Sequence, residues 1–203
     1  MSTRATYQFN DKQTKTTIYT HYDGYPEGAA EYLYLTLTNE GKGNLATRFI
    51  RTNPNAEITV SHDYHCDTDY KYTIEGNDIH GSIIGKKYSY ETDKYDVVIC
   101  CSLISFFELH KDSIKDYSDF RVITTEYGSS RTMNRSQAAR WLERQIEHLR
   151  LWKGKYEGMA NWRSCVRTAK DIIKVFPELL NPEIQSFFDQ DKPSTYIKHE
   201  LGQ

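Results

Sequence analysis

The sequence lacks the short motifs that mark nucleotide-binding and zinc-binding proteins. Neither Gly-x-Gly-x-x-Gly nor Gly-Lys-Ser/Thr occurs in its 203 residues, so no loop that cradles a dinucleotide or a triphosphate is indicated. Cysteine pairs at C-x-x-C spacing are also missing, and these are the commonest signature of small zinc and redox sites. We therefore expect no bound cofactor.

Cysteine is scarce, and long hydrophobic runs are absent. The four cysteines are Cys66, Cys100, Cys101 and Cys165. The adjacent pair lies in an apolar strand whose neighbouring side chains point to opposite faces, so no disulfide framework is expected. No segment approaches the roughly 20 apolar residues of a membrane span, and the polar first residues do not resemble a secretory leader. We expect a cytoplasmic protein with no membrane partner.

Aromatic residues are plentiful, although hydrophobic residues make up only 38% of the chain. There are 16 tyrosines and 8 phenylalanines, and their rings bury large apolar areas. A chain of this length can therefore form a sizeable core, and extensive disorder is not expected. The length fits one large domain or two small lobes.

The first half of the sequence reads as β-strands separated by turn residues. Turn signals lie at 53–55, 76–77 and 85–87, and we interpret residues 75–78 as a tight hairpin turn. The apolar run at 97–101 does not alternate, which predicts a central strand buried on both faces. The predicted strands span residues 3–10, 16–22, 57–62, 70–75, 78–84, 87–91 and 95–103, with a further candidate at 120–125.

Helical spacing appears between residues 26 and 52, where Gly41-Lys42-Gly43 predicts a break between two helices. These helices should cover one face of the sheet. Residues 104–118 fit either an extended or a helical path.

Beyond Gly128 the pattern is again helical. Asn134 is a plausible N-cap, Gly158 can end the first helix, and Asn181-Pro182 predicts the start of a short third helix. We expect the last dozen residues to be loosely packed.

These patterns predict an α+β fold, with an antiparallel-rich N-terminal sheet and covering helices, followed by a C-terminal helical hairpin. The predicted boundary separates a sheet lobe at 1–128 from a helical lobe at 129–203 that packs on it. No pattern specifies an oligomeric state.

The first candidate site lies where the N-terminal hairpin ends. If Asn10 pairs with Thr16, Arg4 faces Tyr22 and Thr3 faces Asp23, and Arg4 is then within reach of Asp23. These positions form one patch with His21 and Tyr25. The patch comprises Thr3, Arg4, His21, Asp23 and Tyr25.

Two interpretations of this patch stay open. An Arg4–Asp23 ion pair would lock a structural corner. Alternatively, an enzyme would use Arg4 to grip a phosphorylated or nucleotide substrate, while His21, oriented by Asp23, transfers protons.

The same segment carries a family resemblance. Residues 2–9 read STRATYQF, and residues 16–33 read TTIYTHYDGYPEGAAEYL. This string resembles a largely uncharacterised family of small phage and prophage proteins. Those proteins tend to open with Met-Ser/Gly-Thr-Arg and carry a His-x-Asp-Gly-Tyr-Pro-like stretch soon after. The resemblance covers about the first 35 residues. It implies a viral or mobile-element origin but no established active site.

A cluster of histidines and acids lies at residues 62–69. His62, His65 and Cys66 are weak candidates for metal ligands, because zinc takes three or four N, S or O ligands. In an extended chain His62 and Cys66 share one face and His65 the other, so neither face provides a closed set. We interpret the stretch as a polar loop or edge strand.

Positive charge concentrates in the second half. Residues 131–176 contain 11 Lys or Arg and four acids, a net +7, so the rest of the chain carries −9 against the total of −2. Cations recur along the second predicted helix at spacings of 4, 3 and 4, which places them on one face. The candidate binding residues are Arg140, Arg144, Arg163, Arg167, Lys170 and Lys174.

These observations favour a phage accessory protein that works by binding. Accessory phage genes of this size often encode inhibitors of host defence, anti-CRISPR proteins among them. We expect the partner to be a host defence protein or a ribonucleoprotein complex, which the protein would occlude. The enzyme above and a nucleic-acid-binding protein, whose affinity would fall steeply with salt, are the alternatives.

Overall fold

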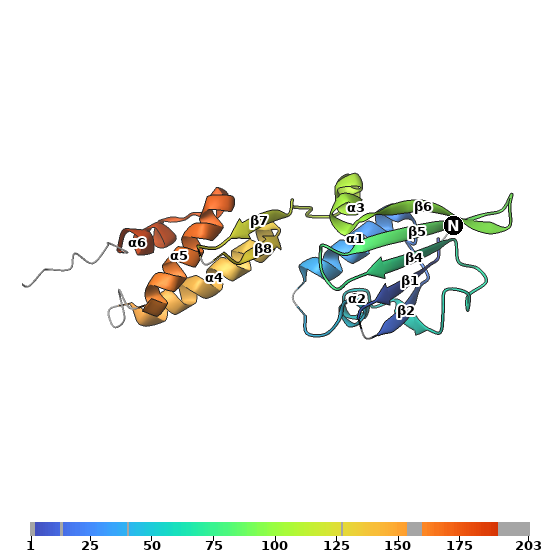
Figure 1. Cartoon of the computed structure of the whole chain (residues 1–203), viewed down its shortest axis with the longest axis horizontal. Helices are drawn as coiled ribbons and strands as arrows, with labels where there is room; N and C mark the ends of the chain where they lie inside the picture. The colour runs from blue at the N-terminus through green and yellow to red at the C-terminus, as the bar shows by residue number, and fades with distance from the viewer. Residues whose placement is uncertain (1–2, 13, 40, 127, 154–159, 191–203) are drawn as a thin grey trace, which may run out of the picture. The chain divides into compact units, whose positions relative to one another are not determined.

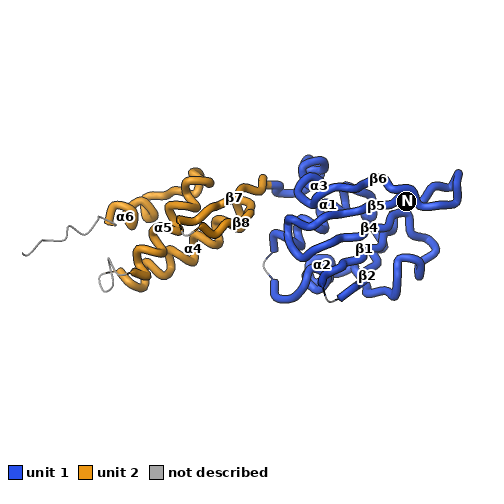
Figure 2. Tube along the Cα trace, viewed as in Figure 1, with its two compact units in different colours: residues 1–117 blue, residues 118–203 orange. Residues whose placement is uncertain are grey.

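The chain divides between Tyr117 and Ser118 into two compact units (Figure 2). The computed structural model describes residues 3–12, 14–39, 41–126, 128–153 and 160–190. The division comes before the predicted boundary after residue 128, because the strand predicted at 120–125 pairs inside the second unit. The prediction of an α+β fold is confirmed.

A six-stranded sheet forms the first unit (Figure 1). Its order is β3-β2-β1-β4-β5-β6, and every neighbouring pair is antiparallel except β1 and β4, which run parallel. The sheet is therefore antiparallel-rich, as predicted, but mixed. Its strands are β1 (Ala5–Asn10), β2 (Lys15–Thr20), β3 (Ala56–Thr59), β4 (Tyr70–Glu75), β5 (Ser82–Ser89) and β6 (Lys94–Ser102).

The N-terminal hairpin exists, but its predicted register is wrong by one residue. Asn10 pairs with Lys15 and Tyr7 with Ile18. The cause is the turn, in which the Asp11 amide donates to the Thr14 carbonyl at 3.0 Å. The turn therefore closes one residue earlier than predicted. Because strand side chains alternate, this shift changes which side chains of β2 share a face with those of β1.

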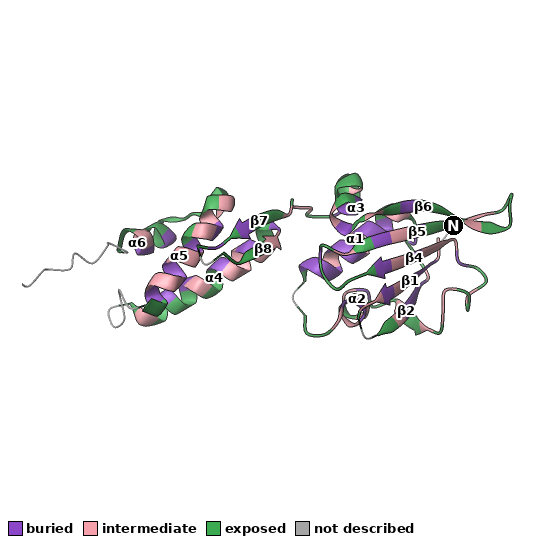
Figure 3. Ribbon diagram, viewed as in Figure 1, coloured by how far each residue is buried: buried purple, intermediate pink, exposed green. Residues whose placement is uncertain are grey.

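Two helices cover one face of this sheet, as predicted. They are α1 (Pro26–Thr38) and α2 (Leu45–Thr52), and both contain buried residues (Figure 3). The ring of Phe49 on α2 lies 4.8 Å from that of Tyr7 and 5.1 Å from that of Phe9, measured between centroids. All three rings are buried. This aromatic contact joins the helix layer to β1.

The predictions for the far side of the sheet need correction. Residues 85–87 form no turn, because β5 continues through them with a bulge between Gly85 and Lys86. The connection between β4 and β5 runs over residues 76–81 and is longer than a tight hairpin turn. The prediction of a central strand at 97–101 is wrong, because β6 lies at the sheet edge, where Val97 is 59% and Val98 50% exposed.

The ambiguous segment after β6 is partly helical. It contains α3 (Leu103–Leu109) and a short 3₁₀ helix, η1 (Lys111–Ser113). Phe106 and Phe107 on α3 are buried, which explains why the apolar residues of this segment did not alternate.

The second unit combines a small hairpin with helices. The strands β7 (Arg121–Thr124) and β8 (Ser130–Met133) pair antiparallel, and β8 was not predicted because it is short and polar. The helices are α4 (Arg135–Trp152), α5 (Ala160–Val175), the 3₁₀ helix η2 (Pro177–Leu179) and α6 (Pro182–Gln190).

The helical predictions for this unit agree with the structure where it describes them. The side chain of Asn134 accepts from the Gln137 amide in a capping box. Asn181 accepts from the Ile184 amide at 2.9 Å at the start of α6. The predicted helix end at Gly158 and the last dozen residues lie outside the described residues. The core of this unit includes Leu142, Ile146, Leu149, Trp162, Val166, Ile172 and Phe176.

Candidate functional site

The Asp-Gly-Tyr-Pro stretch forms the chain reversal between β2 and α1. Asp23 has a positive φ of 54°, and the Gly24 amide donates to the Thr3 carbonyl at 3.0 Å. Pro26 occupies the first helical position, where its missing N–H is not needed. A Cβ atom on Gly28 would lie 2.1 Å from the carbonyl oxygen of Asp23. Residues 23–28 therefore shape this reversal.

The predicted corner residues do not converge. Arg4 forms an ion pair with Asp67, and its amide donates to the Asp69 carboxylate at 3.1 Å. His21 Nε2 lies 3.0 Å from Glu57 Oε1. The predicted Arg4–Asp23 pair is not formed, because the register differs by one residue and because loop 60–69 supplies other carboxylates.

Asp23 instead accepts hydrogen bonds from two tyrosines. The hydroxyl of Tyr25 donates to Oδ1 at 3.3 Å, and that of Tyr32 on α1 donates to Oδ2 at 3.4 Å. The Asp23 carboxylate raises the pKa of Tyr25, and burial together with Asp23 raises the pKa of Tyr32 to about 12. Both hydroxyls therefore stay protonated at neutral pH and tie the reversal to α1.

The His62–Asp69 cluster belongs to the loop that returns the chain from β3 to β4. His62 Nδ1 lies 2.7 Å from Thr6 Oγ1 on β1, and its Nε2 lies 3.4 Å from Thr73 Oγ1 on β4. Thr6 and Thr73 face away from the helices, because Tyr7 and Tyr72 face them. The ring thus bridges the parallel strands on the open face of the sheet.

This environment keeps His62 neutral. Burial, with Lys71 nearby, lowers the pKa of His62 to about 4. The Lys71 ammonium pairs with Asp63 at 2.6 Å and lowers the pKa of that carboxyl. A neutral imidazole between two hydroxyls is satisfied without a metal ion.

The other two weak metal candidates are directed elsewhere. The ring of His65 stacks on Tyr19 with centroids 3.8 Å apart, and its Nε2 lies 3.0 Å from Thr59 Oγ1. Cys66 is exposed. Within the described residues, no three His, Cys, Asp or Glu side chains are grouped so that they could hold a metal ion. The histidines of the cluster therefore attach loop 60–69 to the sheet.

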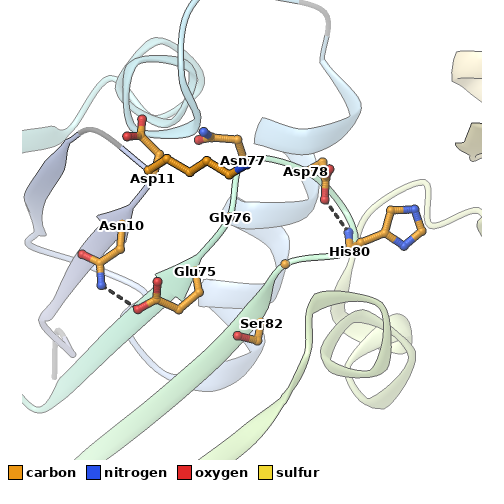
Figure 4. A pocket seen from close by; sticks show the side chains of 10 residues that line it. Asn10, Asp11, Glu75, Gly76, Asn77, Asp78, His80 and Ser82 are labelled. Carbon is orange, nitrogen blue, oxygen red and sulfur yellow. Dashed lines mark hydrogen bonds between the residues drawn. The ribbon is translucent and has the colours of Figure 1, made fainter.

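An open hollow of the first unit is lined by none of the predicted site residues (Figure 4). It is an open groove of about 740 Å³ between the β1–β2 turn and the β4–β5 connection. Its polar groups bond to one another: Asn10 donates to Glu75 at 2.7 Å, and the His80 amide donates to Asp78 at 2.8 Å. We therefore interpret this groove as a structural feature, in which hydrogen bonds hold the two connections together, and not as a binding site.

A smaller cavity of about 220 Å³ lies beside His21. Three segments enclose it: the end of β2, the second turn of α1 and the connection from α2 to β3. The cavity is lined by Thr20, His21, Tyr22, Glu31, Tyr32, Leu35 and residues 52–56. Of the five predicted corner residues, His21 lines this cavity and Thr3, Arg4, Asp23 and Tyr25 do not.

The predicted basic residues lie on two helices of the second unit. On α5, Arg167 pairs with Glu126 at 3.2 Å, and the Lys170 ammonium lies 5.6 Å from the centre of the Phe188 ring. Arg163 is half-buried and Lys174 exposed. On α4, Arg140 is half-buried and Arg144 exposed.

The sequence analysis did not predict which carboxylates pair with Arg4, His21 and Arg167. Glu57 and Glu126 were not singled out, and Asp67 and Asp69 were considered only as part of the possible metal cluster at 62–69. Local spacing carried no signal for which carboxylate would reach Arg4.

Comparisons with protein-family models, with curated proteins and with solved structures found no match to this chain. Among the helices that the structure describes, none combines the length and hydrophobicity that crossing a bilayer requires.

The close approach at Gly28 gives a test of the reversal. We expect Gly28→Ala to lower the free energy of unfolding by about 1–3 kcal/mol, because the added methyl group must displace backbone. Gly41→Ala is the matched control, since its Cβ would meet only the Arg48 side chain at 3.4 Å. Urea unfolding compares the two variants, and equal stability would contradict this account of the motif.

The neutral state of His62 predicts a pH dependence of stability. Below the ordinary histidine pKa of about 6.5 the unfolded chain binds a proton that the folded protein excludes until about pH 4. Stability should therefore fall as the pH drops through this window, by about 2 kcal/mol after allowing for partial solvent screening. Urea unfolding between pH 7 and 5 measures the slope.

In the variant His62→Gln this slope should be smaller than in the unmodified protein. His148→Gln, at an exposed position on α4, should keep the original slope. An unchanged slope in His62→Gln would show that His62 is not held neutral by the fold.

Proposed function

We propose that the protein is an accessory protein of a phage or mobile element that inhibits a host defence system by binding and occluding a protein or ribonucleoprotein complex. The N-terminal resemblance supports the viral origin. The exposed basic face of α5 carries the binding part of the proposal.

The two units differ in charge. Residues 1–117 contain 12 Lys or Arg and 17 Asp or Glu, a net −5, whereas residues 118–203 contain 14 and 11, a net +3. Opposite net charges on two units can steer encounters with partners that carry both signs.

The α5 helix has a strongly two-sided character. Trp162, Val166 and Ala169 are buried in the core of the second unit. Lys170 and Lys174 are exposed, one helical turn apart. With Arg163 they form a cationic surface that we call the α5 basic face. Such a face suits an acidic protein groove or a bound nucleic acid within the target complex.

The enzyme alternative requires Arg4, His21 and Asp23 at one point. Each of these side chains contacts a different partner, as described above. His21→Ala distinguishes the two classes. A binding protein keeps its partner in this variant, whereas an enzyme would remain folded and lose turnover.

Direct binding of nucleic acid is the second alternative, favoured by the spacing of cations along α5. It requires an affinity that falls steeply with salt concentration. Affinity for an acidic protein surface also weakens with salt, but it survives nuclease treatment of the extract.

Reversing the charge of the α5 basic face tests the proposal. We expect Arg163→Glu/Lys170→Glu/Lys174→Glu to lose the host partner in a pull-down from host-cell extract while keeping its circular dichroism spectrum. Lys111→Glu/Lys115→Glu reverses exposed cations of the first unit and should retain the partner. Mass spectrometry identifies the captured proteins, and undiminished capture by the α5 variant would exclude this face.

A further inference from the structure

The outer edge of β3 has no partner strand in the part of the chain that the structure describes. β3 ends the sheet order, so its outward N–H and C=O groups are available for pairing with another extended segment. Ile58 pairs with Ile18, which lies opposite Tyr7, so Ile58 is on the helix-facing side. Ile58 is nevertheless 71% exposed, and Val60 is 80% exposed.

The 220 Å³ cavity beside His21 adjoins this edge. Ala56 both begins β3 and lines the cavity. Cavities for small molecules usually measure about 300–1,000 Å³, so this one suits a single long side chain better than a complete ligand. A strand added beside β3 would direct alternate side chains toward the helix-facing side, where the cavity lies.

The lining selects a positively charged side chain. Glu31 lines the cavity, its carboxylate forms no hydrogen bond or ion pair within the described residues, and no Lys or Arg lines the cavity. A further carboxylate lies close by, since Asp23 accepts a hydrogen bond from Tyr32, which also lines the cavity.

Aromatic rings complete this lining. Tyr22 is exposed and Tyr32 is half-buried, and both line the cavity. The faces of aromatic rings attract cations, and tyrosine is enriched where proteins bind one another. The Glu31 carboxylate and the two tyrosine rings thus both favour a positively charged group.

We infer that the β3 edge and the adjacent cavity bind an extended segment of a partner protein, with a Lys or Arg side chain of that segment in the cavity. Backbone hydrogen bonds along β3 provide the pairing, Ile58 contacts an apolar residue two positions from the cation, and Glu31 provides the charge. This surface lies wholly in the first unit, so it does not depend on the α5 basic face.

Peptide titration of the full-length protein tests this inference. The probe is acetyl-Val-Thr-Arg-Thr-Val-amide, with a Gln-centred peptide of the same length as control. NMR chemical shifts of backbone amides report the site and the dissociation constant. We expect shifts at residues 56–60 and in the second turn of α1. Binding of the Arg peptide should be at least about ten times tighter than that of the Gln peptide.

Three variants separate the contributions. Glu31→Gln should weaken the Arg peptide about tenfold and leave the Gln peptide unchanged. Ile58→Ser should weaken both peptides several-fold. Val98→Ser, an equally apolar exposed position on the opposite edge strand β6, should weaken neither. The spectrum of each free variant reports whether it keeps its fold.

Several results would overturn the inference. These are no saturable shifts, equal affinity for the Arg and Gln peptides, an unchanged affinity in Glu31→Gln, or shifts confined to β6. Blocked arginine that binds as tightly as the peptide would show a site for a small cation, and would exclude strand addition. Peptide binding that persists in the α5 charge-reversed variant would distinguish this surface from the one proposed above.

Discussion

The parallel pairing of β1 with β4 is the constraint on which the first unit depends. Parallel neighbours need a long connection, and here it carries β2, α1, α2 and β3 before loop 60–69 returns past β2 and β1. His62 fixes this return by bridging Thr6 and Thr73. Asp69 accepts from the Arg4 amide just before β1 begins. The polar cluster in the loop therefore holds two strands together that are remote in sequence.

The same constraint explains what the sequence could and could not predict. Alternation, turns and caps revealed the N-terminal hairpin, the two covering helices and the starts of α4 and α6, because these depend on neighbouring residues. Long-range pairing leaves no local pattern, so the parallel contact was not foreseen. The apolar run at 97–101 was misplaced because an edge strand and a central strand of this composition look alike. In β6, Ile99 is the residue that is buried, and it marks the face of the strand that packs on the core.

The candidate sites show the same limit. Residues 3–4 and 21–25 were correctly expected to lie near one another, since the Gly24 amide bonds to the Thr3 carbonyl. The partners of their side chains were not predicted. These partners depend on a one-residue shift in the strand register and on loop 60–69, which is distant in sequence. Helical spacing placed the α5 cations correctly on that helix. It could not predict that Glu126 would contact Arg167 or that Phe188 would contact Lys170, because these residues lie outside α5.

The groups that resembled catalytic machinery thus hold the fold together, and we propose that the α5 basic face contacts a partner. Hydrogen exchange of the protein, alone and bound to the complex captured from host extract, tests this division most directly. We expect binding to slow exchange in α5, at residues 160–175, and to leave the reversal at 23–28 unchanged. Slowed exchange confined to the reversal, with α5 unaffected, would contradict it.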